Sequence, residues 1–303
     1  MTPRRSDNRR GPARAGATAR TSSRARTNGR PAGRPPGPPR ERERSGDRER
    51  STDRGRGTDR GRSFARPASL PQGERRERRP APPAAIEAAL RRQPWDSLRT
   101  LLQRIEAPEN ALERLKAYTR LVLEWNRGVS NIVARGDEPR LVERHLIESI
   151  SPARALRESG ATRWIDFGSG AGLPAVPLAI AGVGTHWTLV ESRRMKTLFL
   201  RKVIHEIGLQ YFDVINDRLE NAVLDPALDR DRDGFTSRAT MALAPTLELA
   251  APLVRASGSA FLWKGSRADA EMAADPSWRK AWDHSASIPV GSGPNIVARF
   301  IRK

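Results

Sequence analysis

The amino-acid sequence predicts an α/β protein built on a doubly wound sheet of seven strands, mostly parallel, with an antiparallel last strand. From residue 163 onward, short apolar runs alternate with helical patterns, which is typical of βαβ units and of a parallel sheet. A glycine-rich turn follows the first of these runs and leads into a helix. Two final apolar runs are separated only by a short turn rich in glycine, so they must pair antiparallel.

The elements follow from the same patterns. Strands are expected at residues 163–167, 186–191, 212–215, 235–237, 259–263, 286–290 and 295–301. Helices between them are expected at 173–181, with Pro174 at its first position, at 196–208, near 219 and at 245–254. A helical lead comes first, with helical patterns at 84–89 and 95–105, a long helix from Pro108 to Gly128 and another near 141–149.

The turn after the first strand carries the most specific signal. Gly168, Gly170 and Gly172 follow a buried apolar run, and a backbone without Cβ atoms lets a ligand approach closely. Their spacing is not the Gly-x-Gly-x-x-Gly of dinucleotide sites, which disfavours NAD. Glu191 lies nineteen residues after Gly172, at the end of the next strand, where an acid accepts hydrogen bonds from ribose hydroxyls. The pattern therefore predicts S-adenosylmethionine as the cofactor.

The composition changes sharply near residue 85. Residues 1–85 contain 24 arginines, no lysine and nine acids, which is +15 of the chain's net charge of +20. Because this stretch has almost nothing apolar to bury, we expect a disordered extension over 1–85, a helical segment over 86–158 and a cofactor-binding domain over 159–303. The arginine-rich arm is an RNA tether, a linker without a required role or a transit peptide.

Several chemistries are disfavoured by composition. The chain has no cysteine, which excludes disulfides, thiol nucleophiles and cysteine metal sites. Its four histidines show no ligand spacing, so no metal is expected. There is no secretory signal and no long apolar run, so we expect a soluble, cytoplasmic protein without membrane contact. A monomer is expected.

A series of short blocks occurs in a specific order over residues 95–303. The main blocks are Glu124-Trp125-Asn126, Glu143-Arg144-His145-Leu146-Ile147-Glu148-Ser149, Gly168 to Pro174, Glu191-Ser192, Arg218-Leu219-Glu220, Ser237-Arg238-Ala239 and Lys264-Gly265. Single blocks are common, but the whole series resembles the bacterial small-subunit ribosomal RNA methyltransferase G family, also called the GidB family. Ala175, Val133, Glu191 and the pair Gly234-Phe235 depart from the family pattern, and the arginine-rich arm is not part of it.

The resemblance implies a Rossmann-like class I methyltransferase that moves a methyl group from S-adenosylmethionine to N7 of a guanine in 16S ribosomal RNA of the small ribosomal subunit. Guanine N7 has an in-plane lone pair and no proton to lose, so no general base and no catalytic residue are expected. The expected cofactor-binding residues are Gly168, Gly170, Gly172, Leu173, Glu191, Leu219, Glu220 and Arg238. The candidates for RNA contacts are His145, Arg193, Arg194, Lys196 and Lys264.

Structural roles compete with these functional ones. Asp166 either contacts the cofactor or fixes the turn through backbone hydrogen bonds. Arg238 either lines the ligand pocket or pairs with Asp233. His145 is a helix-packing side chain or an RNA contact, the basic residues after Glu191 contact phosphate or belong to a solvated helix turn, and Trp125 lies in the core or stacks on RNA.

Two other functions remain open from the sequence. One is an S-adenosylmethionine-dependent methyltransferase with a different acceptor, either a small molecule or another RNA base. The other is a non-catalytic RNA-binding or ribosome-assembly protein that keeps the same fold, although the intact glycine turn and its acid argue against it.

Overall fold

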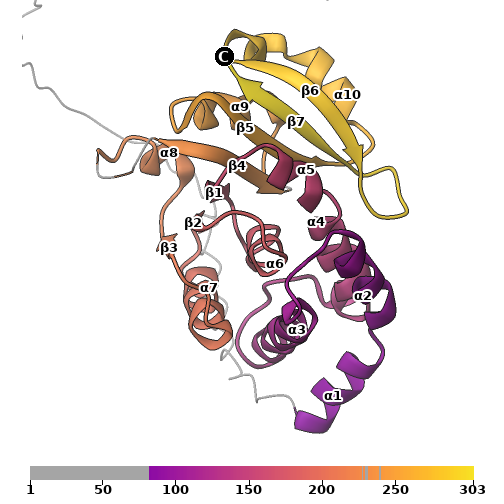
Figure 1. The fold of residues 1–303 in the computed structure, drawn as a ribbon. Coiled ribbons are helices and arrows are strands. Elements are labelled where there is room, and N and C mark those ends of the chain that lie inside the picture. Colours follow the sequence, from indigo (N-terminus) through magenta and orange to yellow (C-terminus); the bar gives the residue numbers. More distant parts are fainter. Residues whose placement is uncertain (1–81, 227, 229–230, 239) are drawn as a thin grey trace, which may run out of the picture. The chain divides into compact units, whose positions relative to one another are not determined.

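The structure, a computed structural model, describes residues 82–226, 228, 231–238 and 240–303. In these residues seven strands form one sheet in the order β3-β2-β1-β4-β5-β7-β6 (Figure 1). The strands are β1 (Arg163–Phe167), β2 (His186–Val190), β3 (Phe212–Ile215), β4 (Arg232–Arg238), β5 (Val254–Lys264), β6 (Trp282–Pro289) and β7 (Ile296–Arg302). Strands β1 to β5 pair parallel, and β7 is antiparallel to both β5 and β6. The predicted mostly parallel sheet with a reversed last strand is confirmed.

Helices precede the sheet and connect its strands. Before β1 come α1 (Pro83–Arg91), α2 (Trp95–Arg104), α3 (Ala111–Gly128), the 3₁₀-helix η1 (Arg135–Arg140), the π-helix η2 (Leu141–Ile147), α4 (Glu148–Ile150) and α5 (Ala153–Glu158). Between or after strands lie α6 (Ala175–Ile180), α7 (Arg194–Ile207), α8 (Leu219–Ala222), α9 (Leu243–Ala250), α10 (Ala268–Ala274) and the 3₁₀-helix η3 (Pro276–Lys280). The boundary predicted between the helical segment and the cofactor-binding domain, after residue 158, lies between α5 and β1.

The apolar core consists of two clusters on opposite faces of the sheet. Trp164 belongs to the cluster shared with α3, α6 and α7, whereas its neighbour Ile165 belongs to the cluster shared with α8 and α9. This split reflects the alternation of side chains along a strand. The Trp164 ring stacks on Trp187 of β2 with centroids 5.5 Å apart, so the two tryptophans anchor the face that the helical lead covers.

Gly234, one of the departures from the family pattern, has a packing reason. A Cβ atom at this position would lie 2.3 Å from Cε3 of Trp164, so the β4 backbone reaches the indole only because residue 234 is glycine. We expect Gly234→Ala to destabilise the fold by about 1–3 kcal/mol through overpacking. Urea unfolding measures the effect, with Gly136→Ala as a control because nothing lies within 4 Å of its Cβ position. Equal stability of the two variants would contradict this account.

Several predicted boundaries were wrong by a few residues. Helix α1 begins at Pro83, inside the predicted extension, because proline is favoured in the first helical turn. The remainder of that extension, residues 1–81, lies outside the described residues. Helix α3 begins at Ala111, since the carbonyl of Pro108 first closes a turn by accepting from the Ala111 amide at 2.9 Å. Pro174 precedes α6, and its carbonyl accepts from the Leu178 amide at 3.1 Å.

The segment expected to be an ordinary helix near 141–149 begins instead as the π-helix η2. The side chain of Gln93 lies across its start: the amide nitrogen donates to the carbonyl of Glu138 at 2.9 Å, and the amide oxygen accepts from the Val142 backbone at 3.1 Å. Those two backbone groups are four residues apart and would bond each other in an α-helix. A side chain from the loop before α2 therefore takes the place of one helical hydrogen bond.

Candidate active site

The glycine loop, residues 168–172, connects β1 to α6 at the carboxyl edge of the sheet. All three of its glycines have positive φ angles of 67°, 57° and 89°. A Cβ atom at Gly168 would lie 2.2 Å from Thr240 Cγ2, and one at Gly172 would lie 2.7 Å from Val176 Cγ2. At Gly170 a Cβ atom would make only ordinary contacts, at 3.7 Å from the Gly168 carbonyl and the Lys196 ammonium, so this glycine is the least crowded of the three. The middle of the loop is where a ligand can approach the backbone.

Glu191 directly follows β2 and lies beside this loop, as the sequence predicts. The residue is 6% exposed. One carboxylate oxygen accepts a hydrogen bond from the Gly170 amide at 2.9 Å, and the other accepts from the Arg193 amide at 2.8 Å. A carboxylate has about four acceptor sites, so both oxygens retain capacity for ribose hydroxyls. Glu191 thus joins the glycine loop to the start of α7.

Asp166 is the buried acid of β1. Its side chain accepts a hydrogen bond from the Thr236 hydroxyl at 2.6 Å, so the side-chain bond goes to β4 and not to the loop backbone. The loop is held instead by the Asp166 carbonyl, which accepts from the Ser169 hydroxyl at 3.1 Å. Burial raises the pKa of Asp166 to about 7. Its second carboxyl oxygen has no partner among the described residues, which leaves a buried polar group facing no protein donor.

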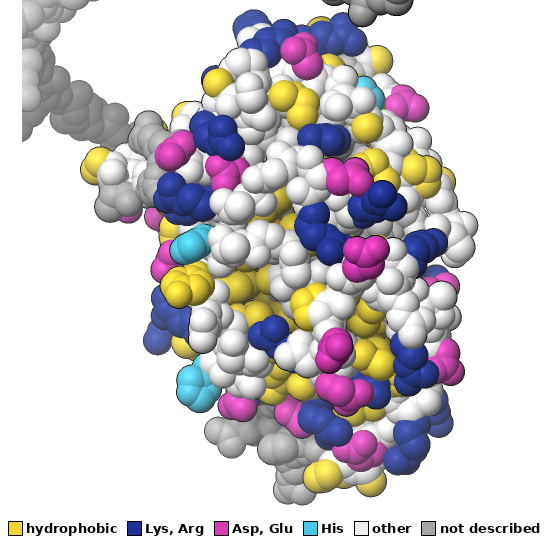
Figure 2. All heavy atoms as spheres, in the orientation of Figure 1, with side chains coloured by type: hydrophobic (Ala, Val, Ile, Leu, Met, Phe, Trp, Pro, Cys, Tyr) yellow, Lys and Arg dark blue, Asp and Glu magenta, His cyan; other side chains and the backbone are white. Residues whose placement is uncertain are grey.

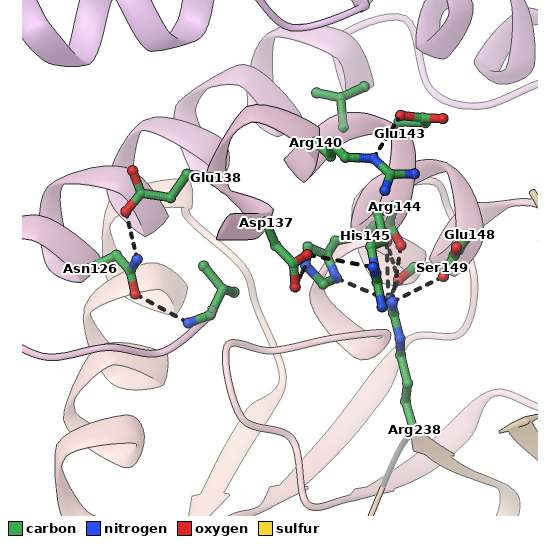
Figure 3. A network of polar contacts seen from close by, with 12 residues as sticks. Asn126, Asp137, Glu138, Arg140, Glu143, Arg144, His145, Glu148, Ser149 and Arg238 are labelled. Carbon is green, nitrogen blue, oxygen red and sulfur yellow. Dashed lines mark hydrogen bonds and ion pairs between the residues drawn. The ribbon is translucent and has the colours of Figure 1, made fainter. Parts of the chain in front are cut away.

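Arg238, at the end of β4, reaches the segment formed by η2 and α4 (Figure 3). Its guanidinium forms an ion pair with Glu148 at 3.1 Å and donates to the Ser149 hydroxyl at 3.2 Å and to the Arg144 carbonyl at 3.0 Å. Both charged side chains of the ion pair are about 15% exposed, at 14% and 15%. The alternative pairing with Asp233 is wrong, because that acid binds Arg255 at 2.7 Å at the opposite end of β4.

His145 belongs to the same network. Arginine only donates, so the 3.1 Å contact from Arg238 identifies Nδ1 of His145 as the acceptor and places the ring proton on Nε2. Nε2 lies 3.6 Å from the Asp137 carboxylate. Burial and then the charge of Arg238 lower the pKa of His145 to about 4, so the imidazole is neutral at physiological pH. The side chain packs in its helix and is tied to the end of β4.

The remaining predicted residues differ in how accessible they are. Leu219 is wholly buried in the cluster on the α8–α9 face, whereas Glu220 is exposed. Arg193 and Arg194 are exposed at the start of α7, and Leu173 and Lys196 are half-buried. The ammonium of Lys196 is 3.7 Å from the Cβ position of Gly170, which places this cation against the glycine loop.

Lys264 and Trp125 have partners within the protein. The Lys264 ammonium donates to the Met241 carbonyl and to the Glu271 carboxylate, both at 2.9 Å, so a phosphate would compete with these partners. Trp125 packs its ring 5.5 Å from that of Phe199, and its indole nitrogen donates to Ser130 at 3.1 Å.

Tyr118 lies in the long helix predicted before the sheet, and the sequence alone indicates no contact of this residue with the glycine loop. It is 1% exposed, and its hydroxyl donates to the Ala171 carbonyl at 2.8 Å, which ties α3 to the glycine loop. The signal in the sequence was the hydroxyl itself, because a buried tyrosine needs a hydrogen-bond partner.

We expect Tyr118→Phe to weaken S-adenosylmethionine binding about three- to tenfold, because one neutral hydrogen bond contributes about 0.5–1.5 kcal/mol and its removal frees the loop carbonyl. Isothermal titration calorimetry with the folded variant measures the change. Tyr211→Phe is the matched control, since Tyr211 is 66% exposed. An unchanged affinity in Tyr118→Phe would show that the hydroxyl does not position the loop.

In the part of the chain that the structure describes, no helix is long and apolar enough to cross a membrane. The same residues contain no group of three or more His, Cys, Asp or Glu side chains that could hold a metal ion. The positive and negative side chains are intermixed over the face in Figure 2. This mixture agrees with the net charge of about +5 that remains for residues 86–303.

A sheet with this strand order, with a glycine loop held by an acid at the end of β2, is the framework of an S-adenosylmethionine-dependent methyltransferase, and this protein is an enzyme of that class. Residues 111–290 match the family model for GidB, rRNA small subunit methyltransferase G. The chain therefore belongs to the GidB family, as the ordered blocks predict.

Individual relatives agree with the family match. The chain is 35% identical over 188 residues to ribosomal RNA small subunit methyltransferase G of Polynucleobacter asymbioticus, which covers 60% of this chain and 83% of the relative. It is 36% identical over 161 residues to the protein of the same name from Chromobacterium violaceum, covering 53% and 74%. A solved SAM-dependent methyltransferase from Aquifex aeolicus aligns with a TM-score of 0.43 and 13% identity, over 56% of this chain and 96% of that one.

Proposed function

We propose that this enzyme transfers the methyl group of S-adenosylmethionine to N7 of a guanine in 16S ribosomal RNA of the small ribosomal subunit. The observation that carries the proposal is the glycine loop with Glu191 beside it, in a chain that matches the small-subunit rRNA methyltransferase family over residues 111–290. The relatives' names state the small-subunit rRNA, and N7 of a guanine is the acceptor that the resemblance to the family implies.

The residues present suit this cofactor. Gly170 is the least crowded glycine of the loop, and Glu191 keeps acceptor capacity for two ribose hydroxyls. The unpartnered buried oxygen of Asp166 supplies a further polar group beneath the loop. Leu173, just before α6, and Glu220, in α8, border the same edge of the sheet. Arg238 would support the cofactor site by holding the η2–α4 segment against the end of β4.

S-adenosylmethionine supplies an electrophilic methyl group on a sulfonium sulfur. Bound beside the glycine loop and Glu191, it would give this methyl group to the in-plane lone pair of N7 as the carbon–sulfur bond breaks, and the positive charge would pass to the guanine ring. No proton leaves in this step, so the protein needs no general base, and its role is to position the base and exclude water. His145 and Arg238 are consistent with that role: the Nδ1 lone pair of His145 already accepts a hydrogen bond from Arg238, and Arg238 is a cation paired with Glu148.

A methyl-transfer assay tests the proposal. Labelled S-adenosylmethionine is incubated with small subunits, and separately with 16S RNA, that lack the modification, and the labelled base is mapped. We expect label at a guanine N7 with the parent protein and clearly less label with Glu191→Gln at a cofactor concentration near the dissociation constant of the parent. Label at another base or on a small molecule would show that guanine N7 is not the acceptor. Cofactor binding without any methyl transfer would favour a non-catalytic protein.

A further inference from the structure

A hollow of about 530 Å³ opens beside the Arg238 network, and neither the glycine loop nor Glu191 lines it. Three arginines line it, one from the last turn of α2 and two from η1 and η2, and the turn between β6 and β7 closes the other side. We call it the arginine pocket, and its defining residues are Arg104, Arg140, Arg144, Gly291, Ser292 and Asn295.

The arginine pocket lies at the same edge of the sheet as the glycine loop. Strand β4 ends at Arg238, whose guanidinium pairs with one oxygen of Glu148. The other oxygen of Glu148 accepts from the Asn295 amide at 3.2 Å. Asn295 directly precedes β7, whose first residue pairs with Lys264 at the carboxyl end of β5. In Figure 1 the yellow turn between β6 and β7 lies beside α4.

The charge of the pocket is positive once its internal pairs are considered. Glu148 is compensated by Arg238 and approached closely by the turn, since a Cβ atom on Gly291 would lie 3.2 Å from its Cγ. That leaves one further acid, Glu143, among the lining residues, against three guanidinium groups. The pocket therefore keeps an excess of positive charge even when Asp137, the partner of Arg144, is counted, and it lies at the edge of the sheet that carries the glycine loop.

The guanidinium groups are free to exchange partners. Arg104 forms no ion pair or hydrogen bond through its side chain with the described part of the chain, and it is exposed. Arg140 contacts Glu143 at 3.2 Å, and Arg144 contacts Asp137 at 3.6 Å, with both arginine side chains about half exposed, at 54% and 50%. Exposed pairs of this kind are weak, so a phosphate can replace the carboxylates.

The remaining lining groups suit a phosphodiester. Guanidinium groups bind phosphate through paired, charge-assisted hydrogen bonds. The exposed turn adds the hydroxyl of Ser292 and the backbone amides beside Gly291, whose φ angle is 66°. Contacts of this type fix the position of a nucleic acid strand without reading its sequence.

We propose that the arginine pocket binds a backbone phosphate of the RNA strand that carries the target guanine, and so sets the register of that strand at the active site. This inference rests on the proposed function, because it takes RNA as the substrate. It places the RNA strand against α2, the η1–η2 segment and the β6–β7 turn. The exposed basic residues at the start of α7 are not needed for it.

The test compares two double variants of the full chain. Arg104→Ala with Arg140→Ala removes two guanidiniums from the pocket, and Arg99→Ala with Arg154→Ala removes two exposed ones elsewhere, each paired only with a neighbouring acid on its own helix. We measure binding to unmodified small subunits and to 16S RNA over a range of salt concentrations. For the pocket variant we expect about tenfold weaker binding, and a salt slope smaller by roughly 0.7–0.9 for each phosphate that the variant no longer neutralises.

S-adenosylmethionine affinity is measured in parallel and is expected to stay at the parent value, which shows that the cofactor site is intact. If the pocket variant binds RNA with the affinity and salt slope of the control variant, the inference is wrong. If inorganic phosphate binds the parent protein as well as the RNA does, and the pocket variant loses both equally, the pocket is an ion site and the strand assignment is wrong.

The outcomes also separate this inference from the proposed function. Loss of RNA binding in the pocket variant, together with methylation of a base other than guanine N7 by the parent, supports the pocket and rejects the acceptor. Guanine N7 methylation that both double variants perform with equal RNA affinity supports the acceptor and rejects the pocket.

Discussion

Glu191→Gln is expected to weaken S-adenosylmethionine binding by about tenfold to a hundredfold. The substitution keeps the shape of the side chain but removes the charge, so one of the two backbone amides that now donate to the carboxylate faces an amide NH₂ group. Hydrogen bonds to a charged partner contribute about 1.5–3 kcal/mol, and this range corresponds to the expected change in affinity. Calorimetric titration of the folded protein measures it.

The control for this experiment is Glu206→Gln. Glu206 lies in the last turns of α7, pairs with Lys202 at 3.0 Å on the surface and loses the same unit of charge when substituted. We expect its cofactor affinity to match the parent. If Glu191→Gln also binds S-adenosylmethionine like the parent, the acid at the end of β2 is not the ribose contact and serves only to hold the glycine loop.

Arg238→Ala is expected to lower the free energy of unfolding by about 3 kcal/mol. Removing one partner of a largely buried ion pair leaves the other charge without compensation, and such losses cost about 3–5 kcal/mol. We take the low end because Glu148 keeps its hydrogen bond from Asn295 and retains some solvent contact. The variant also loses the bonds that hold η2 and α4 against the sheet. Urea unfolding followed by circular dichroism measures the change.

Arg255→Ala provides the comparison, because Arg255 is 51% exposed and its acid keeps hydrogen bonds from Thr162 and Arg163. An exposed pair of this type contributes at most about 1 kcal/mol. Equal losses in the two variants would show that the Arg238 network does not stabilise the fold. Arg238→Lys separates stability from ligand binding. A lysine keeps the positive charge beside Glu148, but it cannot make the several hydrogen bonds of the guanidinium. A drop in cofactor affinity in the folded lysine variant, measured by titration, would show that the contacts of the guanidinium support cofactor binding.

Local patterns in the sequence are enough to predict the sheet, the glycine loop and the acid that follows it. Alternating apolar runs predict the strands, three glycines predict the turn, and Glu191 stands at the end of an apolar run. The position of Glu191 beside Gly170 follows from the parallel pairing of β1 with β2, because carboxyl ends of neighbouring parallel strands meet at one edge. These features need no knowledge of distant side chains.

The side chains that support the site are chosen by packing between elements far apart in the chain. Arg238 finds Glu148 ninety positions away, Tyr118 reaches Ala171 across 53 positions, and Gln93 replaces a helical bond 49 positions away. Periodicity along the chain reports which face of an element is buried, not which partner a buried polar group meets. Because a buried polar group needs a partner of fitting geometry, its role is settled by tertiary packing, and that packing is absent from any local pattern.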